Sequence, residues 1–356
     1  MKHPDDKFKY QELKRCLIER ITSGQLLCGS RIESEPSLSK TFGLSRNTIR
    51  QAVGELEQEG FVYRIQGKGT FVRSKAALKN RRVALLIYDT AYMIHPVTGA
   101  LISGIDKALR PKGYVLDILA GKRGFYEEDL AQISNRYAGF LIGAYQLDDL
   151  TLQELDKVPL PHIFVKNYRP DKMDCAMRID FERAGFIAAA HLAEQCKRSL
   201  ALVYSGEKLA ISAEFRQGVI NAALEYGVKI KNSNVFDCSA MSDGELEKKV
   251  EQVINGADAP DAFVCFTDEF AMRIIEVLKR KNIGVPQQIA ITGCNDSQLS
   301  SVITPSLTSV SMPFVELGEK SAAMLLEMVE GKKCKPFCLA PKLIVRESST
   351  IMQRKD

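Results

Sequence analysis

The sequence is poor in histidine and lacks the arrangements that most catalytic and metal centres need. Its four histidines, His3, His95, His162 and His191, are far apart and show no metal-ligand spacing. No Gly-x-Ser-x-Gly nucleophile elbow occurs. Carboxylate pairs such as that at residues 148–149 lie in polar contexts that suit a solvated surface. These absences argue against an enzyme, and no cofactor is expected.

Long apolar runs are also missing. No stretch reaches the length of a membrane span, and residues 1–6 do not resemble a signal peptide. The nine cysteines form an odd, scattered set, which suits free thiols in a reducing compartment. Cys334 and Cys338 are the closest pair, but no second cysteine or histidine pair lies near them, so no zinc site is expected. We predict a cytoplasmic protein without a membrane partner.

Excess positive charge is confined to the N-terminal end of the chain. Residues 1–75 contain 14 Lys and Arg against 9 Asp and Glu, a net charge of +5. The whole chain contains 49 and 44, so residues 76–356 contain 35 of each and are neutral overall. This distribution is typical of a nucleic-acid-binding module joined to a neutral domain.

The basic segment contains the pattern of two helices separated by a sharp turn. Ser34 can cap a short helix over residues 35–42, Gly43 permits the turn, and Ser45 can cap a second helix over residues 46–58. The second helix has an apolar face made by Ile49, Ala52, Val53 and Leu56. Its other face presents Arg46, Asn47, Arg50 and Gln51, which are side chains that bond phosphates and base edges. This is the helix-turn-helix pattern, with the second helix as the reader.

A β-hairpin is predicted directly after the reader helix. Its tip, residues 66–70, contains two glycines on either side of Lys68 and suits a wing that contacts DNA backbone or minor groove. The tip is not a phosphate-binding P-loop, because Val62 stands at the leading glycine position and Gly69 follows the lysine. A helix over residues 8–23 precedes the motif. Residues 74–80 form a basic linker, which either tracks phosphates or is merely solvated.

The N-terminal segment resembles the winged-helix domain of GntR-family transcription regulators over about residues 7–73. The matching segments are 10–13, 21–24, 31–38, 44–50, 56–62 and 67–72. Glu33 stands where the family usually has proline. Together with the residue chemistry, the resemblance implies binding to double-stranded operator DNA. The predicted contact residues are Ser34, Glu35, Ser45, Arg46, Asn47, Thr48, Arg50, Gln66, Gly67, Lys68, Gly69 and Thr70.

From residue 82 the pattern changes to alternating strands and helices. Strands are predicted at residues 83–88, 114–119, 139–143, 162–165, 200–204, 261–266, 289–293 and 342–346. Helices are predicted at 97–109, 127–136, 181–195, 213–226, 268–281 and 315–329. Repeated βα units predict doubly wound parallel sheets, and the length suits two lobes with a cleft between them.

This region resembles the sugar-binding domain of LacI/GalR-type regulators, a periplasmic-binding-protein-like fold, over about residues 81–347. The similar segments are residues 213–218, 266–271, 285–296 and 305–310. The resemblance implies that Arg216 bonds sugar hydroxyls and that Thr267 and Asn295 occupy two further ligand positions. Thr267 replaces an asparagine and Asn295 an aspartate, and both keep hydrogen-bonding capacity.

The remaining ligand candidates are Lys166, Cys238, Tyr88, Asp89 and His95. Lys166 stands near another aspartate position of the family, where a cation would favour an acidic or phosphorylated sugar. Cys238 stands where an aromatic platform is common. Tyr88, Asp89 and His95 follow the first strand, where loops meet the ligand in this fold.

The sequence therefore predicts a multi-domain chain: a winged helix-turn-helix domain (α+β) at residues 1–74, a linker at 75–81 and a two-lobed α/β domain at 82–356. The predicted function is a dimeric, sugar-responsive transcriptional regulator, most simply a repressor of a carbohydrate-use operon. Three alternatives stay open: a sugar-phosphate effector, an activator, and a DNA-binding protein without an effector.

Overall fold

The fold is that of a computed structural model. It describes residues 4–22, 25–27, 29–58, 61–65, 67–72, 81–87, 96–120, 136–143, 160–165, 176–206 and 209–350. The chain divides into two compact units. The first is Met1–Arg81 with the short segments Asn135–Ala138 and Val329–Lys332, and the second contains the remainder. We call residues 1–81 the head and the second unit the body.

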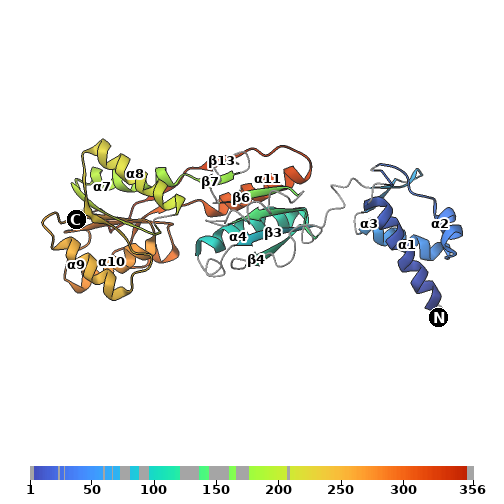
Figure 1. The fold of residues 1–356 in the computed structure, drawn as a ribbon, viewed down its shortest axis with the longest axis horizontal. Coiled ribbons are helices and arrows are strands. Elements are labelled where there is room, and N and C mark those ends of the chain that lie inside the picture. The colour runs from blue at the N-terminus through green and yellow to red at the C-terminus, as the bar shows by residue number, and fades with distance from the viewer. Residues whose placement is uncertain are drawn as a thin grey trace, which may run out of the picture. The chain divides into compact units, whose positions relative to one another are not determined.

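The head is a three-helix cluster with a two-stranded antiparallel hairpin (Figure 1). Its elements are α1 (Pro4–Thr22), α2 (Glu35–Phe42), α3 (Arg46–Gln58), β1 (Val62–Ile65) and β2 (Gly69–Val72). One buried cluster joins Leu13 and Leu17 of α1 to Ile49 and Val53 of α3. Helix α1 begins earlier than the predicted residue 8, which is consistent with Pro4 being tolerated in a first helical turn.

The first sheet of the body forms the N-terminal lobe. Its order is β13-β7-β6-β5-β3-β4, and all neighbours are parallel. The strands are β3 (Arg82–Ile87), β4 (Val115–Ala120), β5 (Gly139–Ile142), β6 (His162–Val165), β7 (Ala176–Ile179) and β13 (Phe337–Leu339). Helices α4 (Pro96–Leu109), which η2 (Arg110–Lys112) continues, and α11 (Phe314–Val329) belong to this lobe.

The second sheet forms the C-terminal lobe, in the order β14-β12-β11-β10-β8-β9. The strands are β8 (Ser199–Tyr204), β9 (Lys229–Asp237), β10 (Ala262–Cys265), β11 (Ala290–Cys294), β12 (Thr308–Ser311) and β14 (Lys342–Ile344). Helices α7 (Phe181–Glu194) and α8 (Ala210–Tyr226) cover one face, and α9 (Asp243–Ile254) and α10 (Asp268–Arg280) cover the other (Figure 1). A 3-10 helix, η4 (Gln298–Ser301), follows β11.

Strand β8 shows why this sheet is buried on both faces. Successive side chains of a strand point to opposite faces. Leu200 and Leu202 join the core under α7 and α8, whereas Ala201 and Val203 join the core under α9 and α10. The continuous apolar runs in the sequence reflect this double cover, as expected for parallel sheets.

Two pairs of glycines let helices cross at close range. A Cβ atom at Gly218 of α8 would lie 1.9 Å from the carbonyl oxygen of Glu182, and one at Gly185 of α7 would lie 2.0 Å from that of Phe215. In the N-terminal lobe, Gly104 of α4 and Gly318 of α11 form the equivalent crossing. A larger residue at these positions would force the helix backbones apart.

The predicted fold class is confirmed: a helix-turn-helix head precedes a body with two βα sheets. Several elements were not predicted, namely β7, β9, α9, β12 and β13. The final strand β14 is antiparallel to β12, so the second sheet is not wholly parallel. The predicted helix at 127–136 lies almost entirely outside the described residues. Within the described ranges, no helix is long and apolar enough to span a bilayer.

Candidate functional sites

The reader helix α3 is held by a cap and by one buried face. The backbone N–H of Thr48 donates to Ser45 Oγ at 3.2 Å, and the two hydroxyl oxygens lie 2.8 Å apart. Ile49 and Leu56 are fully buried. The side chains of the predicted readers Arg46, Asn47 and Arg50 are exposed on the opposite face. The helix therefore presents polar side chains to solvent from a fixed support.

Glu35 is an internal counter-ion for two arginines of this surface. Its carboxylate accepts hydrogen bonds from Arg50 Nε at 3.3 Å and from an Arg50 terminal nitrogen at 3.1 Å. Arg64 of β1 lies 3.8 Å from the other carboxylate oxygen, and its Nε lies 3.5 Å from Glu57. These contacts tie the start of α2, the reader helix and the hairpin together. They also fix the direction of Arg50, whose side chain stays 61% exposed.

The hairpin tip is shaped by Gly67 and Gly69, whose φ angles of 74° and 116° favour glycine. The side chain of Lys68 is exposed. A groove of about 370 Å³ runs between the tip and the start of α2, and its walls include Ser34, Glu35, Gly67, Gly69 and Thr70. The structure thus brings these five predicted DNA-contact residues together, while Gln66 lies outside the described residues.

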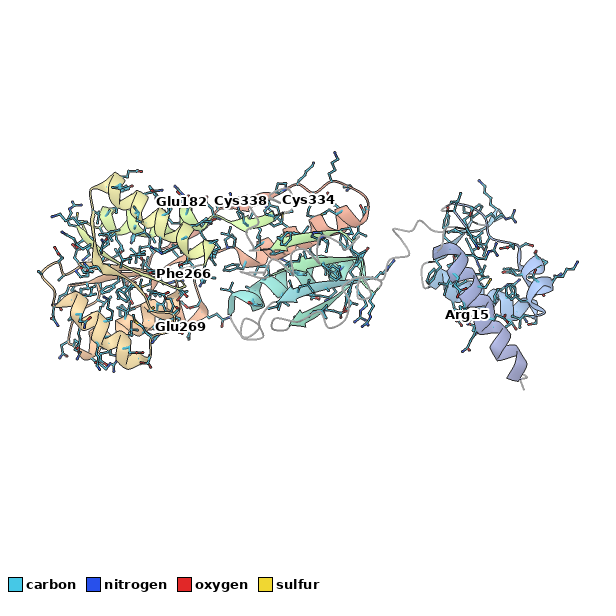
Figure 2. All side chains as sticks on the ribbon, viewed as in Figure 1. Arg15, Glu182, Phe266, Glu269, Cys334 and Cys338 are labelled. Carbon is cyan, nitrogen blue, oxygen red and sulfur yellow. The ribbon has the colours of Figure 1, made fainter. Side chains whose placement is uncertain are left out.

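In the body, a cavity of about 260 Å³ lies between residues of the two lobes. Its apolar walls include four phenylalanines, Phe181, Phe266, Phe270 and Phe314. The polar groups that line it are Thr98, Ser205, Ser239, Thr267, Glu269, Arg273 and Asn295. Phe266 and Glu269 belong to the C-terminal lobe (Figure 2). Aromatic faces with a few converging hydrogen-bonding groups are typical of a small-molecule site.

The two predicted ligand residues Thr267 and Asn295 line this cavity together. They directly follow the neighbouring parallel strands β10 and β11, and carboxyl ends of parallel strands are where ligands bind in α/β folds. Thr267 also caps α10, because its hydroxyl oxygen accepts a hydrogen bond from the backbone N–H of Phe270 at 3.3 Å.

The backbone around Asn295 is held in an unusual conformation. Asn295 and Asp296 have φ angles of 108° and 51°, a region that side chains other than glycine seldom adopt. Arg346 donates to the Asp296 carboxylate at 2.6 Å, and the Asp296 backbone N–H donates to Ser309 Oγ at 3.0 Å. This network holds the Asn295 loop at the edge of the cavity.

Asp268 holds the same loop in place through hydrogen bonds. It is 2% exposed, and its carboxylate accepts hydrogen bonds from the backbone N–H of Ser297 at 2.6 Å and from the Ser309 hydroxyl. Burial raises the pKa of the Asp268 carboxyl above its ordinary value, and the hydrogen bonds partly oppose that rise. Asp268 therefore supports the cavity wall without lining it.

Arg273 lines the cavity and was not predicted from the sequence. Its Nε donates to the Asp243 carboxylate at 3.0 Å and a terminal nitrogen donates to the carbonyl of Met241 at 2.8 Å. Glu269 was also missed. Both residues follow the Thr267 cap on α10 and are four positions apart, so helical spacing from Thr267 could have indicated them.

The predicted placement of Arg216 beside Thr267 and Asn295 needs correction. On α8, Phe215 points into the core with its ring centroid 5.3 Å from that of Phe266. Arg216 is one residue further and is rotated by about 100° around the helix. It lies over the Tyr204 ring, 4.3 Å from the centroid, and lines a different groove.

Cys238 also requires correction as a ligand residue. Its side chain is fully buried in the core under α9 and α10, and burial raises the pKa of its thiol to about 12. Tyr88, Asp89, His95 and Lys166 lie outside the described residues. Among the described residues, no cluster of three or more His, Cys, Asp or Glu side chains could hold a metal ion.

An exposed reader helix with a wing, followed by a two-lobed body with an interlobe cavity, defines a DNA-binding regulator with a ligand-binding domain. Residues 9–72 match the family described as bacterial regulatory proteins, gntR family. Residues 189–349 match the periplasmic binding protein-like domain. The chain combines a gntR-family helix-turn-helix domain with a periplasmic-binding-protein-like domain.

Two relatives match along nearly the whole chain. The arabinose metabolism transcriptional repressor of Geobacillus stearothermophilus is 28% identical, with 96% of this chain and 97% of the relative covered. A repressor of the same name from Halalkalibacterium halodurans is 25% identical, with 96% of each covered.

Solved structures share the fold. A complex of the transcriptional regulator CelR with cellobiose superposes with a TM-score of 0.68 at 21% identity and covers 95% of this chain and 98% of its own. A LacI family regulator from Enterococcus faecium with bound ribose has a TM-score of 0.64 at 21% identity and covers 76% of this chain and 100% of its own.

Proposed function

We propose that this protein is a dimeric transcriptional repressor of a carbohydrate-use operon, and that a small sugar bound in the interlobe cavity controls its affinity for the operator. The observation that carries the proposal is that one chain combines an exposed reader helix bearing Arg46 and Arg50 with a cavity between two lobes. The full-length similarity to two arabinose metabolism repressors supports it.

On the DNA side, Arg46 and Arg50 read guanines or clamp phosphates, since guanidinium groups fit both partners. Ser45, Asn47 and Thr48 contact the backbone and adjacent bases, and Ser34 and Glu35 lie beside them at the start of α2. Residues 66–70 serve the wing. Two heads of a dimer bind the half-sites of a near-palindromic operator. Glu35 acts here by holding Arg50, because a carboxylate alone repels phosphates.

On the ligand side, the cavity chemistry favours an uncharged sugar. Phenylalanine rings suit the apolar face of a sugar ring, while Thr267, Asn295 and the serine hydroxyls suit its hydroxyl groups. The arginine that lines the described wall, Arg273, is already paired with Asp243, and Glu269 adds a negative charge. The sugar-phosphate alternative therefore depends on Lys166, which lies outside the described residues.

Control of DNA binding requires that the sugar distinguish two forms of the protein. Closure of the lobes on the sugar changes the separation of the two heads in the dimer. To lower operator affinity by about 10- to 100-fold, the sugar must bind the DNA-free form more tightly by about 1.4–2.7 kcal/mol. An activator would use the same coupling with the opposite sign.

A thermal-shift screen of the full chain tests the ligand class. The panel contains pentoses, hexoses, 6-deoxysugars and sugar phosphates at saturating concentration, because binding to the native state raises the melting temperature. A shift with one neutral sugar that is smaller in Asn295→Gly supports the proposal. A shift with sugar phosphates alone would favour the alternative effector, and no shift across the panel would favour a body that only dimerises the heads.

A further inference from the structure

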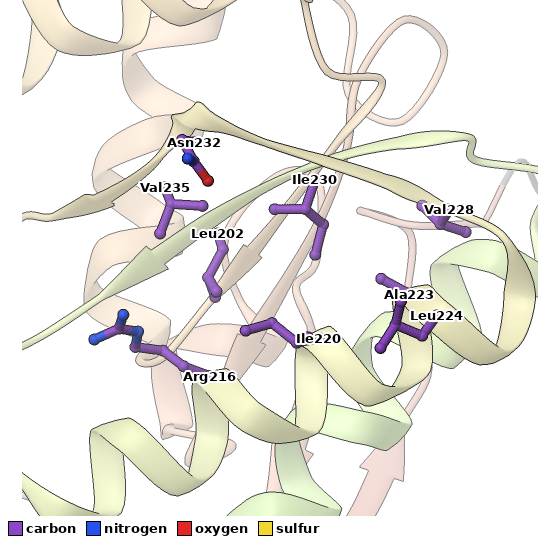
Figure 3. Close-up of a pocket in the computed structure, with 9 residues that line it drawn as sticks. All are labelled: Leu202, Arg216, Ile220, Ala223, Leu224, Val228, Ile230, Asn232 and Val235. Atoms are coloured by element: carbon purple, nitrogen blue, oxygen red, sulfur yellow. The ribbon is translucent and has the colours of Figure 1, made fainter.

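A second, larger cavity lies on the C-terminal lobe, away from the residues that line the interlobe cavity. It is a groove of about 570 Å³ between helix α8 and strand β9. Aliphatic side chains form most of its walls: Ile220 on α8 faces Ile230 and Val235 on β9 (Figure 3). The proposed sugar site does not use any of these residues, so the groove needs an explanation of its own.

The groove results from how α8 is packed. The glycine crossing at Gly185 and Gly218 brings α8 against α7 at close range. Strand β9 is the last strand of its sheet, and α8 contacts both β8 and β9 at that edge. Two large aliphatic side chains of α8 are therefore left at the rim, Ile220 at 40% exposure and Leu224 at 77%. These exposed aliphatic side chains offer apolar surface to a ligand that enters the groove.

A fixed positive charge stands at one end of the groove. Arg216 lines it, with its guanidinium carbon 4.3 Å from the centroid of the Tyr204 ring. Among the described residues, no carboxylate lies within ion-pair distance of Arg216. A guanidinium stays protonated in proteins, and stacking on an aromatic ring limits its orientations. Figure 3 shows Arg216 at one end of the lining residues and Leu224 and Val228 at the other.

We propose that this groove is a second effector site, which binds an amphipathic monoanion: a carboxylate attached to an alkyl chain or an apolar ring. The carboxylate pairs with Arg216, and the apolar part lies along Ile220, Ile230 and Val235. Charge complementarity selects the anion, because an aliphatic groove with an uncompensated guanidinium at one end binds such a ligand better than a neutral one.

Helix α8 connects this site to the interlobe cavity. Leu209, which caps α8, and Ile211 in its first turn line the interlobe cavity, whereas Arg216, Ile220 and Leu224 of the same helix line the groove. A ligand that shifts α8 at one site therefore changes the other. Such coupling is reciprocal, so the anion changes sugar affinity by the same factor as the sugar changes anion affinity.

Isothermal titration of the full chain with decanoate, below its critical micelle concentration, tests the proposal. Acetate and the neutral isostere decanamide serve as ligand controls. We expect decanoate to bind about tenfold or more tightly than decanamide, since a charged hydrogen bond is lost in the amide. Arg216→Gln should remove this preference. Arg183→Gln is the matched protein control, because Arg183 lies over the Phe186 ring of the same lobe but outside the groove.

Three results would overturn the proposal. They are no decanoate binding, equal binding of decanoate and decanamide, and an unchanged decanoate affinity in Arg216→Gln. A further variant, Ile220→Asp, should weaken decanoate binding without changing the sedimentation coefficient. If Ile220→Asp instead dissociates an assembly, a second copy of the chain covers the groove and the proposal is wrong. The sugar-induced thermal shift of Arg216→Gln reports separately on the proposed interlobe site.

Discussion

The head and the body place the side chains proposed to bind DNA and ligand in opposite environments. In the head, Arg46 and Arg50 stand on the solvent face of one helix, and Arg50 is 61% exposed although it pairs with Glu35. In the body, Thr267 and Asn295 come from two different strand ends and line a cavity with four phenylalanines. A surface for a large, charged polymer needs a protruding face, whereas a small neutral ligand needs removal from water.

The head and the body also differ in the contacts that hold these side chains in place. The reader helix depends on a few buried contacts to α1 and on the Ser45 cap. The cavity depends on long-range packing, including the close α7–α8 crossing and the network from Arg346 to Asp296. Changes to body packing should therefore affect ligand binding through stability, while changes on the reader face should alter stability little, because the Arg50–Glu35 pair there is largely exposed.

The largest expected effect is a loss of stability in the body that leaves the head unchanged. Gly218→Ala places a methyl group where the carbonyl oxygen of Glu182 lies 1.9 Å away, so α7 and α8 must move apart. We expect the body to lose about 3 kcal/mol of unfolding free energy, the upper part of the overpacking range. Urea denaturation measures the loss, and hydrogen exchange of head amides should stay unchanged.

Gly244→Ala is the matched control for this substitution. Gly244 lies in the first turn of α9, and a Cβ atom there meets nothing within 4 Å. Its unfolding free energy should equal or slightly exceed that of the parent chain. Equal losses for Gly218→Ala and Gly244→Ala would show that the helix crossing is not the tight contact described.

The next effect concerns the reader face alone. Arg46→Ala and Arg50→Ala should each cost about 1–3 kcal/mol of operator binding and relax sequence preference. Lys68→Ala at the hairpin tip should instead weaken operator and random DNA alike, since a phosphate contact has no sequence information. Fluorescence anisotropy with both kinds of DNA measures these affinities. Equal losses on both DNAs for the two arginine variants would refute the reader assignment.

A smaller effect is expected in the cavity. Asn295→Gly removes the side-chain amide but accepts the φ of 108°, so the fold should be retained. Loss of the hydrogen bonds to the sugar should weaken its binding by about 1–2 kcal/mol, with operator affinity in the absence of sugar unchanged. Calorimetry with the sugar found by thermal shift measures the change. Unaltered sugar affinity would place the ligand elsewhere.

The smallest expected effect is a pH dependence of stability that has opposite signs in the head and the body. In the head, hydrogen bonds from Tyr10 and Lys14 lower the pKa of Glu55 from 4.5 to about 2. Its contribution to stability is therefore present above pH 4.5 and is lost as the pH falls towards 2. In the body, burial raises the pKa of Asp268 above 3.8, so its contribution is present below that pH and is lost as the pH rises through the raised value.

Hydrogen exchange at several pH values measures both trends in one sample. Glu55→Gln should flatten the acid-side loss in head peptides and leave body peptides unchanged. Asp268→Asn should flatten the fall in body protection with rising pH and leave the head unchanged. If both variants alter the same peptides in the same direction, the two carboxyl groups do not act as described.

The sequence predicted the head more fully than the cavity, for physical reasons. Caps such as Ser34 and Ser45, the turn at Gly43 and the apolar face of the reader helix are local signals, and each is found where expected. The wing glycines are equally local. That the wing glycines contact DNA stays a prediction, because the structure shows only where they lie.

The cavity depends on contacts between distant segments, which local patterns do not record. Phe181 and Phe314 stand just after points where the chain passes from one lobe to the other. No spacing in the sequence connects them to Thr267. Arg216 was misplaced because a shift of one helical residue turns a side chain to another surface. The edge strand β9 was missed because its exposed Lys, Asn and Ser residues dilute the apolar pattern of a strand.

The most direct test of the central claim is the operator affinity of the full chain with and without the cavity sugar. The operator is obtained by selection from random duplex DNA, and anisotropy is measured for the parent chain and for Asn295→Gly. We predict that the sugar weakens operator binding by about 10- to 100-fold in the parent chain, with little change in Asn295→Gly at the same sugar concentration. A sugar that binds without changing operator affinity, or that releases Asn295→Gly equally well, would contradict control of the head through the interlobe cavity.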